Sequence, residues 1–124
     1  MRTLPFEVAK YNNFKELIEA MEKVLSENIN GIKEILELLN EKWEGEGAGS
    51  ASYPGMTVLV DPSKDLVLSQ LVPILAHAVM ASKSLRSTTA IFKTIFSESE
   101  LEAPFDIRAI WDGSRVRVVI AKLS

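Results

Sequence analysis

Six cationic side chains in the C-terminal part of the chain could together hold phosphate groups. Three of them lie within about 80° of one another on a helical wheel at 3.6 residues per turn. Serine and threonine residues surround these three, and their hydroxyls are suited to phosphate contacts. The other three lie on a predicted β-hairpin. The full set is Lys83, Arg86, Lys93, Arg108, Arg115 and Arg117.

The pairing expected within that hairpin draws attention to Arg108. Asp112-Gly113 separates two alternating runs, which is the strongest short-range signal for a two-residue turn. This turn would place Arg108 opposite Arg117, and like charges that face each other across a ladder are destabilising. The pair therefore predicts an anion or a carboxylate nearby. The other face would be apolar and covered by helices, and would comprise Phe105, Ile107, Ala109, Trp111, Val116, Val118 and Ile120.

The cations favour a non-catalytic protein that binds nucleic acid, with single-stranded DNA or RNA preferred. Trp111 at the turn, or Ile110 beside Arg108, could offer a surface to an unstacked base. Such a protein would act as an oligomer or as a small subunit of a larger complex. The alternative is a solvated positive face, neutralised by Asp106, Asp112 and the acidic loop at 98–102, or by an acidic neighbouring subunit.

An apolar stripe between residues 14 and 39 is the second candidate site. Its apolar residues recur at steps of three and four, and Asn28 takes one position that should be apolar. The stripe could pack inside its own subunit. It could instead form an oligomerisation seam, in which case the protein would be a structural or interaction subunit without nucleic acid. The residues assigned to this seam are Leu17, Met21, Val24, Asn28 and Leu38.

No other residues form a catalytic or cofactor motif. The stretch GEGAGS at 45–50 follows a helix and precedes a strand, which is the reverse of the order in a dinucleotide-binding loop. Cysteine is absent and His77 is the single histidine, so neither a zinc site nor thiolate chemistry is expected. His77 is expected to be a hydrogen-bonded core residue rather than a proton-transfer group. We therefore expect no enzyme activity, cofactor or metal.

The composition indicates one soluble domain, 1–124, of ordinary globular character. The net charge of −3 hides an asymmetry, since residues 1–50 hold six Lys/Arg against ten Asp/Glu and residues 81–124 hold seven against five. The start lacks a secretory signal pattern, and the apolar run at 66–81 is short for a bilayer. A cytoplasmic protein without membrane contact is expected. The scarcity of glutamine and cysteine favours a thermophilic source, although five asparagines count against it.

The elements predict an α+β fold in which one face of a small antiparallel sheet packs against three to four helices. The sheet would contain an N-terminal edge strand at 2–10, a strand at 56–60 and the C-terminal hairpin at 105–121. The region 13–43 reads as one helix or, slightly favoured, two that break at 28–31. A flexible glycine-rich loop is expected at 44–55, and helices at 66–81 and 85–96.

The general style of this element order is similar to that of small archaeal single-strand-binding proteins. It is also similar to that of the small subunits of archaeal CRISPR effector complexes. No motif specific to either group is present, so the likeness transfers no residues.

Overall fold

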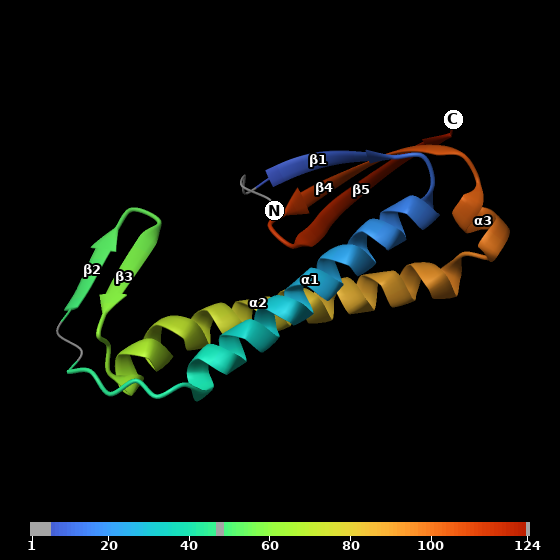
Figure 1. Ribbon diagram of the computed structural model, residues 1–124. Coiled ribbons are helices and arrows are strands. Elements are labelled where there is room, and N and C mark those ends of the chain that lie inside the picture. Colours follow the sequence, from blue (N-terminus) through green and yellow to red (C-terminus); the bar gives the residue numbers. More distant parts are fainter. Residues whose placement is uncertain (1–5, 47–48, 124) are drawn as a thin grey trace. The chain divides into compact units, whose positions relative to one another are not determined.

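The computed structural model of the chain describes residues 6–46 and 49–123 and combines helices with antiparallel strands (Figure 1). In chain order the elements are β1 (Phe6–Tyr11), α1 (Phe14–Asn40), β2 (Gly49–Tyr53), β3 (Met56–Val60), α2 (Lys64–Ile95), α3 (Glu98–Glu102), β4 (Phe105–Asp112) and β5 (Arg115–Leu123). The predicted α+β class is confirmed. Two compact units are present, Met1–Asn30 with Val79–Ser124 and Gly31–Ala78.

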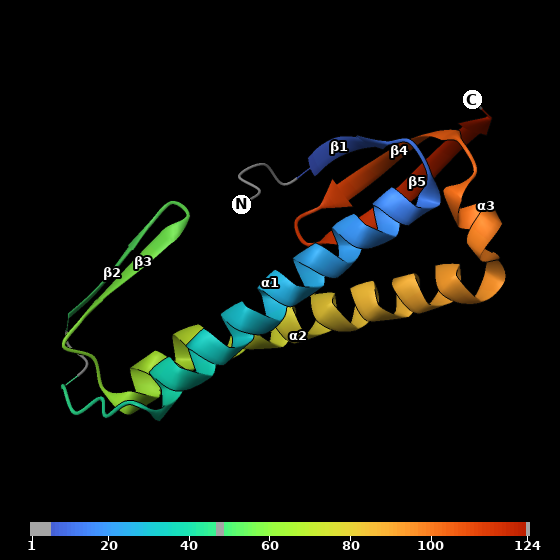
Figure 2. The ribbon, with the colours of Figure 1, turned by 45° about the vertical axis from the view of Figure 1, so that its right-hand side comes forward.

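The first unit contains a three-stranded antiparallel sheet in the order β1-β4-β5. The sheet lies on one side of the segments of α1 and α2 that belong to this unit (Figure 2). We call the face toward these helices the inner face and the other the outer face. The core between the layers includes Phe14, Leu17, Ile18, Met21, Leu85, Ile107, Ala109 and Trp111.

The register of the β4–β5 hairpin differs from the predicted one in two steps. The two-residue loop consists of Gly113 and Ser114, because Asp112 pairs with Arg115 and Gly113 has a φ of 62°. Positive φ at the first loop residue is what glycine supplies in a tight hairpin. A register shift, the mark of a β-bulge, follows between Ile110 and Trp111 and leaves Arg117 without a partner residue in the register.

Only the bulge changes which side chains face the core. Moving the loop shifts the pairing by two residues and keeps the faces, so Trp111 pairs with Val116 on the inner face. The bulge adds one residue, and a one-residue slip exchanges the faces of a strand. Val119 therefore packs on the core, whereas Val118 and Ile120 are 47% and 50% exposed. The prediction that Val118 and Ile120 belong to the core face was wrong, and so was the predicted pairing of Arg108 with Arg117, because Arg108 lies opposite Ile120.

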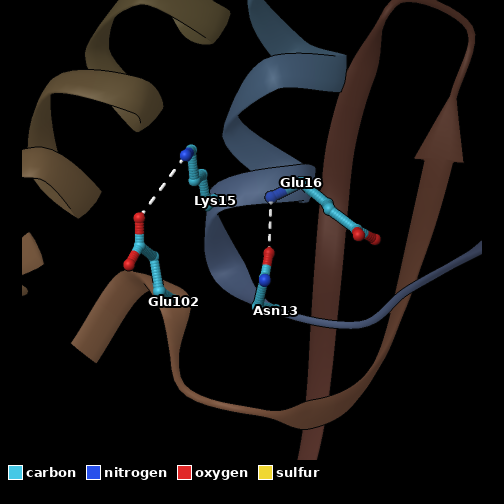
Figure 3. A network of polar contacts seen from close by, with 4 residues as sticks. All are labelled: Asn13, Lys15, Glu16 and Glu102. Atoms are coloured by element: carbon cyan, nitrogen blue, oxygen red, sulfur yellow. Dashed lines mark hydrogen bonds and ion pairs between the residues drawn. The ribbon is translucent and has the colours of Figure 1, made fainter. Parts of the chain in front are cut away.

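Helix α1 is continuous, so the slightly favoured break at 28–31 was wrong. The predicted start is confirmed: the Glu16 backbone N–H donates to Asn13 Oδ1 at 2.8 Å (Figure 3). The Asn12 N–H donates to Glu16 Oε1 at 2.9 Å. Lys15 Nζ of α1 lies 3.4 Å from Glu102 Oε1 at the end of α3, and Figure 3 shows the two side chains pointing toward one another. The bonds to Asn13 Oδ1 and Glu16 Oε1 satisfy backbone N–H groups that have no partner within the helix.

Helix α2 runs without interruption from Lys64 to Ile95 and includes Pro73. Separate helices at 66–81 and 85–96 had been expected. Its N-terminus is capped by Ser63, since the Leu66 N–H donates to Ser63 Oγ at 3.2 Å. Within the described residues, α2 alone is long and apolar enough to cross a membrane by length and composition, a property that core helices of soluble proteins can share.

The second unit contains a separate two-stranded sheet. Strand β3 forms where it was predicted, but it pairs with β2 and does not join the C-terminal hairpin. Strand β2 lies inside the range 44–55 that was predicted to be a flexible loop. Lys64 Nζ donates to the carbonyl of Leu39, and Trp43 Nε1 donates to that of Leu38 at 2.7 Å. These donors satisfy carbonyls in the last turn of α1.

Candidate nucleic-acid interface

The six predicted cations are divided between two layers of the first unit. Lys83, Arg86 and Lys93 are exposed on α2, which packs against the inner face of the sheet. Arg108 and Arg115 lie at outer-face positions of β4 and β5, and Arg117 is exposed at the bulge. The structure therefore does not bring the six together on one surface. One nucleic-acid strand would contact either the three cations of the sheet (the sheet set) or the three cations of α2 (the helix set).

The helix set is partly neutralised within the chain. Lys93 Nζ lies 2.8 Å from Glu22 Oε2 on α1, and both side chains are about half exposed. An exposed pair of this kind contributes about 0–1 kcal/mol to stability. It nevertheless places a carboxylate beside one of the three cations, which lowers the attraction of this surface for phosphate.

On the outer face, cations gather around Asp106. Arg108 Nε donates to Asp106 Oδ1 at 3.1 Å. This hydrogen bond holds the pKa of the Asp106 carboxyl below its usual value, and the charges of Arg108, Lys10 and Lys122 act in the same direction. Three cations therefore act on one carboxylate, and this group carries an excess of positive charge. Asp106 is one of the carboxylates that the alternative of a neutralised positive face named.

The register explains why these cations come together. Lys10 of β1 lies opposite Arg108 of β4, and Asp106 lies opposite Lys122 of β5. Sequence reasoning missed Lys10 and Lys122, because neither could be assigned to this face before the pairing of β1 and the bulge were known. The alternation of Phe6, Val8 and Lys10 along β1 was the available signal.

An apolar strip lies beside the cations on the outer face. Val8, Ile110 and Val118 form one row across the three strands, and Val8 and Val118 are 66% and 47% exposed. Ile120 continues the strip toward Arg108. Phe6, at the start of β1, is 63% exposed and supplies an aromatic ring on this face.

Trp111 cannot serve as the predicted stacking residue. Its side chain is fully buried at 0% exposure, and its Nε1 donates to the Tyr11 hydroxyl at 3.3 Å. The inner-face position opposite Val116 places it in the core. A base could reach the indole ring only if the sheet separated from the helices.

The last predicted cations lie at the turn end of the hairpin. Arg115 is half-buried and pairs across the ladder with Asp112, which puts a carboxylate directly opposite it. Arg117 is exposed at the bulge. Both are separated along β5 from Lys122, so they form the far end of any surface that includes the Asp106 cluster.

The predicted oligomerisation seam is largely internal to the first unit. Leu17 and Met21 are fully buried in the chain's own core, and Val24 packs against that core. Leu38, which belongs to the second unit, is 40% exposed. The stripe was expected either to pack inside its own subunit or to form an oligomerisation seam. Leu17 and Met21 pack inside the subunit.

Asn28 lines a groove of about 550 Å³ beside the β4–β5 turn. The other lining residues include Lys23, Glu27 and Ser114, all of the first unit. The Asn28 Nδ2 atom is buried and has no hydrogen-bond partner among the described residues. Charges of both signs line this groove, so it does not extend the positive surface of the sheet.

His77 is exposed on α2, so the expectation of a core position for it was wrong. Among the described residues, no three His, Cys, Asp or Glu side chains gather in a way that could hold a metal ion.

Comparisons with protein-family models, with curated proteins and with solved structures gave no match.

Proposed function

We propose that the protein binds single-stranded nucleic acid on the outer face of the β1-β4-β5 sheet. The observation that carries this proposal is the convergence of Lys10, Arg108 and Lys122 on Asp106, next to an exposed apolar strip. Cations attract the phosphate backbone, and exposed flat apolar groups accept unstacked bases. A duplex conceals its bases, so it would lose the second of these contributions.

The spacing on the face suits an extended strand. Phe6 and Lys10 are four residues apart on β1, which corresponds to roughly 13 Å along a strand. A phosphate near Lys10, Arg108 and Lys122 would therefore leave room for bases over Val8, Ile110 and Phe6. In this arrangement Phe6 takes the stacking role that the sequence assigned to Trp111.

The test is fluorescence anisotropy with labelled single-stranded and duplex oligonucleotides at 50 and 200 mM salt. We expect the single strands to bind more tightly, with affinity falling steeply as salt rises. The triple variant Lys10→Ala/Arg108→Ala/Lys122→Ala should reduce the slope of log K against log salt by about 0.7, since the three cations surround one phosphate position and each phosphate contact with a single strand contributes about 0.7.

The matched control removes three cations from the other layer. Lys83→Ala/Arg86→Ala/Lys93→Ala changes the net charge by the same amount but leaves the sheet face intact. Equal losses in the two triple variants would mean that binding follows net charge and not this face. Absence of binding by the wild-type protein at 50 mM salt would refute the proposal.

A protein partner is the second candidate for the same face, and the exposed apolar strip favours it. Val8, Val118 and Ile120 are 66%, 47% and 50% exposed on the same face, and exposed apolar groups that lie together can mark a protein interaction site. A protein partner predicts that Val8→Ser/Val118→Ser disrupts a complex while the cation variants leave it intact. Nucleic-acid binding predicts that, at low salt, the cation variants weaken binding more than Val8→Ser/Val118→Ser does.

A further inference from the structure

The β2–β3 hairpin of the second unit has little of its own chain to pack against. A two-stranded hairpin is at best marginally stable in water without further strands or helix packing. Among the described side chains of this unit, only Pro62 and Val67 are buried. A groove of about 330 Å³ lies between β3 and α2. It is lined by Leu59, Leu71 and Ile74 and, at the turn end of β3, also by Met56.

The outward side of β3 is apolar and exposed. Met56, Val58 and Val60 alternate with Thr57 and Leu59, so they share one face of the strand. Their exposed fractions are 59%, 38% and 61%, whereas Leu59 is half-buried beside α2. The unit therefore presents a row of three large apolar side chains.

The free edge of β3 lacks the features that keep strand edges from pairing. Soluble proteins protect such edges with lysine, proline, bulges or a covering element. No charged residue occurs between Glu46 and Asp61, Pro54 lies in the turn, and the β2–β3 register is regular. The other edge of β3 is occupied by β2, so one edge is available for pairing.

The sequence of β3 is self-complementary about Val58. In an antiparallel pair of two copies centred there, Val58 faces Val58 of the second copy and Met56 faces its Val60. All three exposed apolar side chains then meet exposed apolar side chains. The absence of charge matters because the residue on the two-fold axis faces its own copy, so a charged residue at position 58 would meet an identical charge.

We propose that β3 pairs antiparallel with β3 of a second copy of this chain, centred on Val58. The result is a four-stranded sheet, β2-β3-β3-β2, with six apolar side chains on one face. The partner is a second copy because this edge offers no charge for recognising a different surface and its own register matches itself. This dimer involves the second unit and is independent of nucleic-acid binding by the first.

Cysteine crosslinking tests the register directly, because the chain contains no cysteine. Directly opposed side chains have Cβ atoms about 4.5–5.5 Å apart, close to the reach of a disulfide. Val58→Cys should therefore give a crosslinked dimer under mild oxidation. Met56→Cys should not, since the two copies of that position lie about 13 Å apart along the strands. The double variant Met56→Cys/Val60→Cys should crosslink, although neither single variant does.

The mass in solution provides the second measurement. Light scattering at about 50 µM should give the wild-type protein twice the chain mass of 13.8 kDa. Val58→Lys should halve this mass, because two lysines would face each other across the axis. Ile91→Lys, at a 58% exposed site on α2 in the first unit, is the matched control and should leave the dimer intact.

Three results would overturn the inference. The first is a wild-type mass of 13.8 kDa. The second is crosslinking of Met56→Cys as fast as that of Val58→Cys. The third is cosedimentation of the wild-type chain with lipid vesicles that Val58→Lys abolishes while the mass in solution stays monomeric, which would assign the apolar row to a membrane surface.

Discussion

Ile110 of β4 lies opposite Val118 of β5 on the outer face of the sheet, and Val118 is 47% exposed. The next residue along β5, Val119, packs against the core opposite Ala109. This relationship depends on the bulge at Arg117. Without it, Val118 would occupy the core and the outer face would lose the middle of its apolar strip.

A pair of substitutions distinguishes the two registers. Val119→Thr should destabilise the protein by about 1 kcal/mol, because it brings a hydroxyl into the packed side of the sheet. Val118→Thr should change stability by less than about 0.5 kcal/mol, as surface substitutions usually do. Urea denaturation measures both. A larger loss of stability for Val118→Thr than for Val119→Thr would mean that the hairpin has the register without the bulge.

Two glycine-to-alanine substitutions should have opposite signs. An added Cβ would meet nothing within 4 Å at either Gly31 or Gly113, so conformation alone decides. Gly31→Ala should stabilise α1 by about 0.8–1 kcal/mol, since alanine is the better helix former. Gly113→Ala should cost on the order of 1 kcal/mol, because its φ of 62° suits glycine.

The midpoint and slope of a denaturation curve test both glycine predictions. A destabilising Gly31→Ala would mean that α1 breaks near Asn30, as a turn at this point would require. A neutral Gly113→Ala would show that the hairpin loop does not need positive φ there.

The N-cap of α1 contributes measurably to stability. Asn13→Ala removes the acceptor of the Glu16 N–H and should cost about 1 kcal/mol. Asn13→Asp keeps an acceptor and adds a negative charge near the positive end of the helix dipole, so it should preserve stability. Thermal unfolding followed by circular dichroism compares the two, and equal losses would remove the cap from the explanation.

The titration of Asp106 tests the cation cluster independently of any ligand. Its pKa should lie below the ordinary value of 3.8, chiefly because of the hydrogen bond from Arg108. The pair's contribution to stability is then complete above pH 3.8 and is lost as the pH falls through the lower pKa of the folded state. Carboxyl chemical shifts in an NMR titration measure this pKa, which Arg108→Gln should raise. An unchanged pKa of Asp106 in that variant would mean that Arg108 does not bond to Asp106 in solution.

The parts of the fold that local patterns determine were predictable. Asn13 with Glu16 predicted the start of α1, and alternation predicted the strands at both ends of the chain. The short helix α3 was missed although its signal was present, since Ser97 and Glu100 form a capping box. Local spacing carries such features because both partners lie within one turn.

The long-range features could not be predicted in this way. Nothing around Arg117 marks a bulge, and its position decides whether Val118 or Val119 faces the core. The pairing of β3 with β2 depended on a strand that glycine and serine made resemble a loop. The candidate site changed accordingly. Trp111 lies in the core, as its place on the apolar face predicted, and so cannot take the stacking role, while Lys10 joins Arg108 in the cation cluster.

The burial of Trp111 has a spectroscopic consequence. The chain has two tryptophans, and they fall in different units: Trp111 in the core of the first and Trp43 in the second, half-buried, with its indole bonded to Leu38. Trp43→Phe and Trp111→Phe therefore each leave one fluorophore, and each remaining emission spectrum follows one unit during denaturation. Coincident curves would mean that the two units unfold together.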